Sequence, residues 1–239
     1  MKRRLNITKM LRSALLAFLA LGSIPCFGAR SYQPVQGDPL LEPWRWRTFP
    51  ELSGLDAQCM AEGADGTMWF GTANGLWSYD GIEWVSYLTN ETVGRIVTDL
   101  CREANGSLYI GGGWGISQLS NGHWTRLLTI SGGRISDIRD IPIKRLAVGR
   151  NGSLWVATSW GALHRAGATW TLYTDADTAG RLRKDQSLPF PNIELLPETV
   201  TARLRRGSGS SHPCDLTEVS ADAQGRIWFG TTGGEVLRY

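Results

Sequence analysis

Two tryptophans at matching points of a repeated pattern, Trp114 and Trp160, are the side chains best suited to hold a ligand. An indole presents a flat apolar face on which a sugar ring or another flat apolar group can stack. Asn74 stands at the same point of another copy, and Arg134, in a longer connection, could hold a carboxylate by a bidentate contact. We expect these four residues to mark a ligand-binding site. The alternative is structural: the indoles pack against neighbouring connections or fill a central channel, and Arg134 is a solvated surface residue.

Residue types suited to acid–base catalysis are few and scattered. The three histidines are the side chains that ordinarily titrate near neutral pH. The pattern places His123 in a hairpin turn, His164 in a strand and His212 in a long connection. The sequences HExxH, GxSxG and the Walker loop are absent. We therefore predict no catalytic residues and no cofactor.

The cysteines follow no metal-binding or disulfide pattern. Apart from Cys26 in the first 28 residues, the chain has Cys59, Cys101 and Cys214, an odd number at wide spacing. Such cysteines are usually small buried apolar side chains within strands. We predict no metal site.

The first 28 residues have the features of a secretory signal peptide. A basic start without acidic residues is followed by the apolar run 14–21 and by small residues near Gly28 and Ala29. The apolar run is too short to cross a bilayer as a helix. We predict an exported protein in the periplasm or outside the cell. After position 28, 20 of the 25 Lys and Arg remain against all 22 Asp and Glu, which argues against a nucleic-acid surface.

Four copies of one pattern organise the rest of the chain. Each copy has a first glycine, an aromatic residue three places later and a second glycine nine places later, and three copies have a tryptophan eighteen places later. The first glycines are Gly66, Gly106, Gly152 and Gly225; the second are Gly75, Gly115, Gly161 and Gly234; the tryptophans are Trp84, Trp124 and Trp170. This constant spacing identifies one structural unit repeated four times.

Each copy predicts four short antiparallel strands. Asp65-Gly66, Asn105-Gly106 and Asn151-Gly152 suit the hairpin turn between the first and second strands, because they tolerate positive φ angles. Four strands in about 40 residues are typical of a propeller blade. We predict an all-β fold, a β-propeller of four-stranded antiparallel blades with about four blades over residues 44–239. The recurring tryptophans are expected to pack between blades rather than to form a site.

The repeat also resembles a known family. The pattern Asp/Asn-Gly-x-Leu-Trp-Phe-Gly-Thr-x-x-Gly-Leu, followed by Asp-Gly-x-x-Trp, is similar to the two-component regulator propeller repeat, and the resemblance covers residues 44–239. The copies depart from it at Gly112, Ala157 and Glu235. That family forms the extracytoplasmic sensor region of many bacterial hybrid histidine kinases. The resemblance therefore implies a propeller that takes part in signalling.

Two segments lie outside the regular pattern, and one bears on ring closure. Residues 29–43 predict an extended lead-in, and residues 174–213 predict a long insertion without a strand pattern. The stretch 44–49 predicts a strand, and its ending Trp46-x-x-Phe49 matches the fourth strands of other copies. It could complete the last copy and close a ring of four blades. The interpretation that we favour is an incomplete ring or a fragment of a longer propeller.

The resemblance implies a function in sensing. The expected role is an exported propeller that binds a small molecule or glycan and reports to a signalling partner, such as a membrane histidine kinase or a downstream kinase region, because the sequence has no kinase or receiver motif. An extracytoplasmic protein-interaction scaffold is the alternative. A third possibility is a propeller lyase, since streptogramin lyases have a loosely similar repeat.

Overall fold

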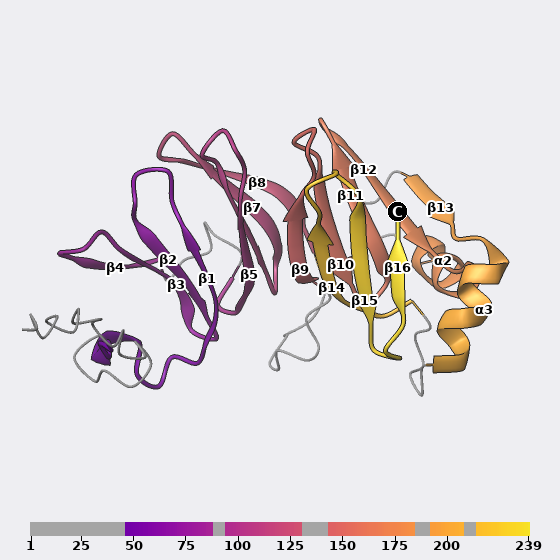
Figure 1. Cartoon of the computed structure of the whole chain (residues 1–239), viewed down its shortest axis with the longest axis horizontal. Coiled ribbons are helices and arrows are strands. Elements are labelled where there is room, and N and C mark those ends of the chain that lie inside the picture. Colours follow the sequence, from indigo (N-terminus) through magenta and orange to yellow (C-terminus); the bar gives the residue numbers. More distant parts are fainter. Residues whose placement is uncertain (1–45, 88–93, 131–142, 185–191, 208–213) are drawn as a thin grey trace, which may run out of the picture. The chain divides into compact units, whose positions relative to one another are not determined.

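The computed structural model describes residues 46–87, 94–130, 143–184, 192–207 and 214–239. These residues form four small sheets with two longer helices beside them (Figure 1). All four sheets belong to the compact unit Phe49–Tyr239. The predicted signal peptide, the lead-in 29–43 and Arg134 lie outside the described residues.

Each sheet corresponds to one copy of the repeat, and its strands follow one another in chain order. The first sheet contains β1 (Ala57–Glu62), β2 (Met68–Thr72), β3 (Gly75–Tyr79) and β4 (Trp84–Tyr87). The second contains β5 (Val97–Arg102), β6 (Leu108–Gly112), β7 (Gly115–Ser120) and β8 (His123–Thr129). The third contains β9 (Ile143–Val148), β10 (Leu154–Thr158), β11 (Gly161–Ala166), β12 (Thr169–Thr174) and β13 (Asn192–Leu195), and the fourth β14 (Leu216–Ala221), β15 (Ile227–Thr231) and β16 (Val236–Arg238).

The sheets are the four blades of a β-propeller, as the repeat predicts. The first strands of successive blades are neighbours: β1 lies beside β5, β5 beside β9, and β9 beside β14. Within each blade the pairing is antiparallel, apart from β13, which pairs parallel with β12. The first strand thus forms the inner edge of its blade, and the later strands lie farther out.

The turn between the first two strands has the same backbone hydrogen bonds in every copy. In the first, the Gly63 N–H donates to the Thr67 carbonyl at 2.7 Å, and the Gly66 N–H donates back to the Gly63 carbonyl at 3.3 Å. The Asp65 carboxylate accepts from the Thr67 N–H at 3.1 Å. Positive φ is confined to the glycine, 83° at Gly66, so the loop is a type I turn followed by a glycine bulge. The positive φ angle expected of the Asp65-Gly66 pair is found at Gly66 alone.

Aromatic residues hold neighbouring blades together. Trp124, from the last strand of the second blade, lies 6.3 Å from Trp69 and 5.8 Å from Tyr87 of the first blade, measured between ring centroids. Trp170 enters the core between the second and third blades, together with Tyr109. Trp69, Tyr109 and Trp170 are each no more than 8% exposed. The recurring aromatic residues at these boundaries are therefore scaffold, as predicted.

The insertion contains regular structure that the sequence pattern did not indicate. It folds into α2 (Ala176–Lys184), the parallel strand β13 and α3 (Glu198–Gly207). Asp175 starts α2 by accepting from the Asp177 and Thr178 N–H groups at 2.9 and 3.0 Å. The expectation of a connection without a strand is corrected: β13 adds a fifth strand to the third blade.

The segment Trp46–Phe49 does not form the predicted strand. These four residues lie outside any strand, and Phe49 packs on Trp84 and Tyr79 with ring centroids 5.6 Å from each. Met60 of the first blade is 69% exposed, whereas the matching residues of the other blades are buried. The first blade thus has an uncovered apolar face, and Phe49 covers part of it. The alternative in which this segment completes the last blade and closes the ring is therefore wrong.

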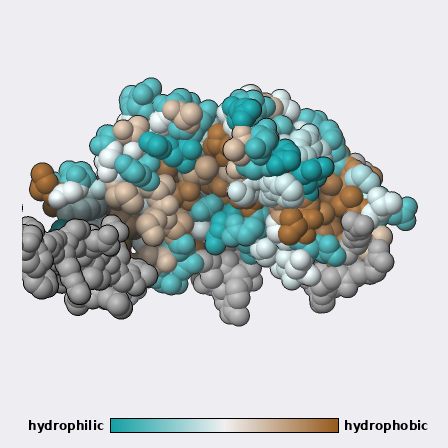
Figure 2. All heavy atoms as spheres, in the orientation of Figure 1, coloured by the Kyte–Doolittle hydropathy of each residue, from teal (hydrophilic) through white to brown (hydrophobic). Residues whose placement is uncertain are grey.

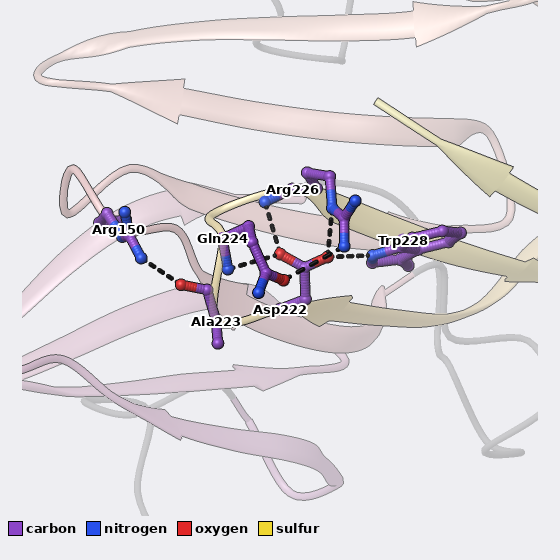
Figure 3. Close-up of polar contacts among 6 residues, drawn as sticks. All are labelled: Arg150, Asp222, Ala223, Gln224, Arg226 and Trp228. Carbon is purple, nitrogen blue, oxygen red and sulfur yellow. Dashed lines mark hydrogen bonds and ion pairs between the residues drawn. The ribbon is translucent and has the colours of Figure 1, made fainter.

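The fourth copy stabilises its turn by a different set of contacts (Figure 3). The Asp222 carboxylate accepts from Arg226 Nε at 2.6 Å and from the Trp228 indole N–H at 2.8 Å. The Arg226 guanidinium lies 5.6 Å from the Trp228 ring centroid, and Arg150 of the third blade donates to the Ala223 carbonyl. The bonds from Trp228 and Arg226 lower the pKa of Asp222. Trp228 is partly exposed where the matching Trp155 is buried between blades, and the arginine covers part of it.

Candidate functional site

One end of the blades brings the second-to-third strand turns beside the connections that enter each blade. The Ala73 N–H donates to the Leu55 carbonyl, the Gly113 N–H to the Ile96 carbonyl at 3.1 Å, and the Thr232 N–H to the Asp215 carbonyl at 3.2 Å. We call this end the turn face. It is the face on which the sequence places Asn74, Trp114 and Trp160, and these residues lie there in the turns 72–75, 112–115 and 158–161.

Trp114 is the exposed indole of the turn face. Its side chain is 39% exposed, and its backbone carbonyl accepts from the Ile130 N–H at 3.0 Å. The ring packs on Gly94, where a Cβ atom would come within 2.8 Å of the indole. The glycine therefore allows the ring to lie flat against the connection between the first two blades.

Trp160 is held more deeply than Trp114. It is partly buried and packs against the core between the second and third blades. The backbone N–H of Trp160 donates to Thr158 Oγ1 at 3.1 Å, and Thr174 Oγ1 donates to the Trp160 backbone carbonyl at 2.5 Å. Trp160 therefore fits the structural alternative, in which the indole packs against its neighbours. Trp114 is the indole better placed to contact a ligand.

Asn74 has a cationic neighbour that the sequence did not single out. Asn74 is half-buried, and its backbone N–H donates to Thr72 Oγ1 at 3.0 Å. The exposed Arg95 donates from Nε to the Ala73 carbonyl at 3.4 Å, next to Asn74. Arg95 follows Gly94 directly, so the second-blade connection supplies both the seat of Trp114 and a positive charge beside the Asn74 turn. Arg134, expected in this role, lies outside the described residues.

A polar group lies on the inner strands close to the same face. Asp99 on β5, Arg145 on β9 and Glu218 on β14 occupy the same place in their copies, seven residues before the first glycine. Asp99 pairs with Gly111, and Glu218 pairs with Gly230. Each pair is the second pair of its two strands, counted from the turn face. Arg145 Nε lies 3.2 Å from Glu218 Oε1, and its Nη1 donates to the Thr98 carbonyl at 3.4 Å.

The surroundings of Asp99 change its acidity. Burial raises the pKa of Asp99 to about 6, although the Leu146 N–H and the charge of Arg145 act in the opposite direction. The Leu146 N–H donates to Asp99 Oδ2 at 2.6 Å. Cys59 is at the same place in the first copy, where burial and the Asp99 charge raise the pKa of its thiol to about 12. Cys59 is therefore a protonated thiol at neutral pH, and not a nucleophile.

This group could not be found from residue types alone. The sequence signal is a repeat position in the first strands that is Cys59, Asp99, Arg145 or Glu218. These residues are recognised as one group only when the inner strands are known to be neighbours. The group can exchange hydrogen bonds with a polar ligand, because it offers two carboxylates and a guanidinium within adjacent strands.

The histidines do not join this group. His164 stacks on Trp155 with ring centroids 4.0 Å apart, and burial lowers its pKa despite the nearby Glu194. His123 lies exposed at the start of β8, and His212 is outside the described residues. In the described part of the chain, no three His, Cys, Asp or Glu side chains are placed to hold a metal ion.

Comparison with known proteins supports the repeat assignment. The model of the family described as two component regulator propeller matches residues 51–74, which include β1 and β2. A search of curated proteins gave no match. Over the described residues, no helix has the length and apolar character needed to cross a membrane.

Several solved structures resemble the chain. A catalytically inactive virginiamycin B lyase from Staphylococcus aureus aligns over 78% of this chain with 12% identity and a TM-score of 0.45. The extracellular domain of a protein described as a hybrid two component system from B. thetaiotaomicron aligns over 74% with 16% identity and a TM-score of 0.42. The extracellular domain of a protein described as a one component system from the same organism aligns over 77% with 19% identity and a TM-score of 0.39.

The chain spans 56%, 19% and 27% of the lengths of these three structures, in that order. The family model gives the more direct likeness, because it matches the repeat itself. The resemblance to the two-component regulator propeller family, which the pattern Asp/Asn-Gly-x-Leu-Trp-Phe-Gly-Thr-x-x-Gly-Leu carries, is confirmed by the family's own model at residues 51–74.

Proposed function

We propose that this chain is an exported sensor propeller of a two-component-type signalling system and that it binds a small polar molecule or glycan at the turn face. The observation that carries the proposal is the Asp99, Arg145 and Glu218 group, one step inside the face on which Trp114 is exposed. Carboxylates and a guanidinium suit sugar hydroxyl groups, and an indole suits the apolar face of a sugar ring. The repeat supports the signalling role.

The partner in this proposal is a membrane histidine kinase, or a kinase region that is not part of this sequence. Ligand binding would change the equilibrium between two arrangements of the sensor only if the ligand binds one of them better. The turn face suits this task, since its turns belong to all four blades and its connections join one blade to the next.

The test is a glycan array with the purified protein, followed by calorimetry on each hit. Replacing Glu218 by glutamine or Trp114 by alanine is expected to weaken binding by about tenfold or more, because each removes one contact worth roughly 1–3 kcal/mol. Both side chains are partly exposed, so the fold is expected to survive. Unfolding curves of the variants verify this.

A matched control is Ile82→Ala. Ile82 is 86% exposed in the turn between β3 and β4, at the opposite end of its blade. The ligand affinity of this variant should equal that of the unmodified protein. The proposal fails if the hits bind Glu218→Gln and Trp114→Ala with unchanged affinity, or if Ile82→Ala weakens binding as much as they do.

A further inference from the structure

In two of the blades, the turn between the first and second strands binds the aromatic residue that follows it. In the second blade, the Tyr109 hydroxyl donates to Glu103 Oε2 at 2.9 Å. In the fourth blade, the Trp228 indole N–H donates to Asp222 Oδ2 at 2.8 Å. Glu103 and Asp222 occupy the same place in their copies, six residues before the aromatic residue. In these two blades the chain itself therefore supplies the acceptor for the polar group of the aromatic side chain.

The first blade has a glycine at this place. Gly63 precedes Trp69 by six residues, and Trp69 is only 8% exposed. A Cβ atom on Gly63 would lie 3.1 Å from Trp69 Nε1 and 2.8 Å from Asp65 Oδ1. Asp65 Oδ1 accepts from the Thr67 N–H, and in the described part of the chain the Trp69 indole donates no hydrogen bond. An N–H group of a buried side chain, without an acceptor, thus faces the space that a side chain on Gly63 would fill.

That space belongs to a cavity of about 240 Å³ between the first two blades. The cavity lies at the end of the blades opposite the turn face, among the turns 62–68, 102–108 and 120–123. Both blades have all four strands, so the cavity lies between complete sheets. Its volume is below the roughly 300–1,000 Å³ typical of sites for drug-sized molecules. The cavity therefore suits a smaller molecule.

Polar side chains form the exposed part of the cavity lining. Asp65, Asn105 and Asn121 line the cavity and are exposed. Asn105 Oδ1 accepts from the Ser107 N–H at 2.8 Å, so the amide NH₂ of Asn105 remains available as a donor. Hydrogen bonds from Thr67 lower the pKa of Asp65, so its carboxylate is ionised at neutral pH. Many hydrophilic residues lie on the visible face of the first two blades, whose strands Figure 1 labels (Figure 2).

Contacts between the two blades fix the position of this lining. A Cβ atom on Gly106 would lie 2.9 Å from the Ala64 Cβ atom, so the turns of the two blades are in close contact. Arg102 of β5 donates from Nη1 to the Gly63 carbonyl at 3.3 Å. The site is therefore assembled before a ligand binds, and binding requires little ordering of the chain.

We propose that this cavity binds a small neutral polyhydroxy compound, a monosaccharide or a polyol of similar size, through Trp69 and Asp65. A hydroxyl group can accept from the Trp69 N–H through its oxygen and donate its proton to the Asp65 carboxylate. Leu108 and Leu119 also line the cavity and offer apolar surface to the C–H groups of the ligand. A carboxylate ligand has no proton to donate and would lie beside the ionised Asp65. This site is separate from ligand binding at the turn face.

The test uses the full chain and follows the indole N–H signals in nitrogen–proton NMR spectra while glucose, mannose, galactose or myo-inositol is added. Trp69→Phe, which keeps an aromatic ring without the N–H group, identifies the Trp69 signal by its loss. That signal should move saturably with at least one of the four compounds, because the N–H group gains an acceptor. Asp65→Asn should weaken binding by about tenfold or more, because it removes the anionic acceptor and keeps the bond from the Thr67 N–H.

Gly63→Asn tests the role of the missing side chain. Its side-chain carbonyl should accept from the Trp69 N–H, as Asp222 accepts from Trp228, and should thereby abolish binding. The variant is expected to fold, because Glu103 and Asp222 carry side chains at this place and make the same backbone hydrogen bond as Gly63. Unfolding curves verify this.

Asp80→Asn is the matched control for Asp65→Asn. Asp80 is an exposed carboxylate that accepts from the Ile82 and Glu83 N–H groups in the turn between β3 and β4, and it is not among the residues that line the cavity. The affinity of this variant should equal that of the unmodified protein. Trp114→Ala, at the opposite end of the blades, should also leave the affinity unchanged, which separates this site from the turn face.

Three results would overturn the proposal. One is the absence of a saturable shift of the Trp69 signal with all four compounds. Another is an affinity of Gly63→Asn or Asp65→Asn equal to that of the unmodified protein. The third is a shift produced by acetate alone, which would assign the cavity to a carboxylate ligand.

Discussion

Replacing Gly161 by alanine is expected to lower the free energy of unfolding by about 3 kcal/mol or more. Gly161 has a φ of 130°, and a Cβ atom there would lie 2.2 Å from the carbonyl oxygen of Tyr173 on β12. Backbone atoms cannot move aside as the end of a flexible side chain can. The substitution therefore combines backbone strain with a clash that requires β11 and β12 to separate. Urea denaturation of the two proteins measures the difference.

Gly234→Ala is the control, because Gly234 occupies the same repeat position in the fourth copy. Its φ is 79°, and no atom lies within 4 Å of the place of a Cβ atom. The expected loss is about 1–2 kcal/mol, from backbone strain alone. The expected losses of the two variants differ because of the fourth strand, which the third blade has and the described part of the fourth blade lacks. Equal losses in the two variants would contradict this explanation.

Replacing Asp99 by asparagine is expected to change how the stability of the protein depends on pH. The pKa of Asp99 is raised from about 3.8 to about 6, so the folded state holds this proton more tightly than the unfolded state. The stabilisation is fully present below pH 4 and is lost as the pH rises through 6. Asparagine can still accept from the Leu146 N–H. Relative to Asp99→Asn, the unmodified protein should lose up to about 3 kcal/mol between pH 4 and pH 7.

Asp175→Asn provides a control of opposite sign. Burial would raise the pKa of Asp175, but hydrogen bonds from Thr178, together with those from Cys214 and Asp177, outweigh it and lower the pKa. The stabilisation from Asp175 is therefore present above its ordinary pKa and declines as the pH falls. Unfolding curves at several pH values between 3 and 8 should show opposite trends for the two variants. A difference between Asp99→Asn and the unmodified protein that does not change with pH would refute the expectation for Asp99.

The uncovered face of the first blade and the far face of the last blade have a common cause. Each blade buries one face against the blade before it and the other against the blade after it. Met60 and Trp84 lie on a face with no preceding blade among the described residues, and there Phe49 supplies a partial cover. Trp228 lies on the far face of the last blade, where Arg226 and Arg238 cover its ring.

Local sequence was sufficient to predict the strands and turns of the repeat. Gly66 and its counterparts take positive φ angles that other residues avoid, and the β-branched and aromatic residues after them favour a strand. The packing role of Trp124 and Trp170 followed from their recurrence at one strand position. These predictions succeeded because hairpin turns and strand propensity depend on residues close together in the chain.

The tertiary structure decided what depends on residues far apart. Trp46–Phe49 has the pattern of a fourth strand, yet the apolar surface of Trp84 and Tyr79 determines where Phe49 packs. Trp114 and Trp160 share one repeat position, but Gly94 supports the first ring at the surface and the core between two blades buries the second. Asp99, Arg145 and Glu218 form one group because adjacent inner strands bring together positions about 40 to 70 residues apart, a proximity that no local pattern encodes.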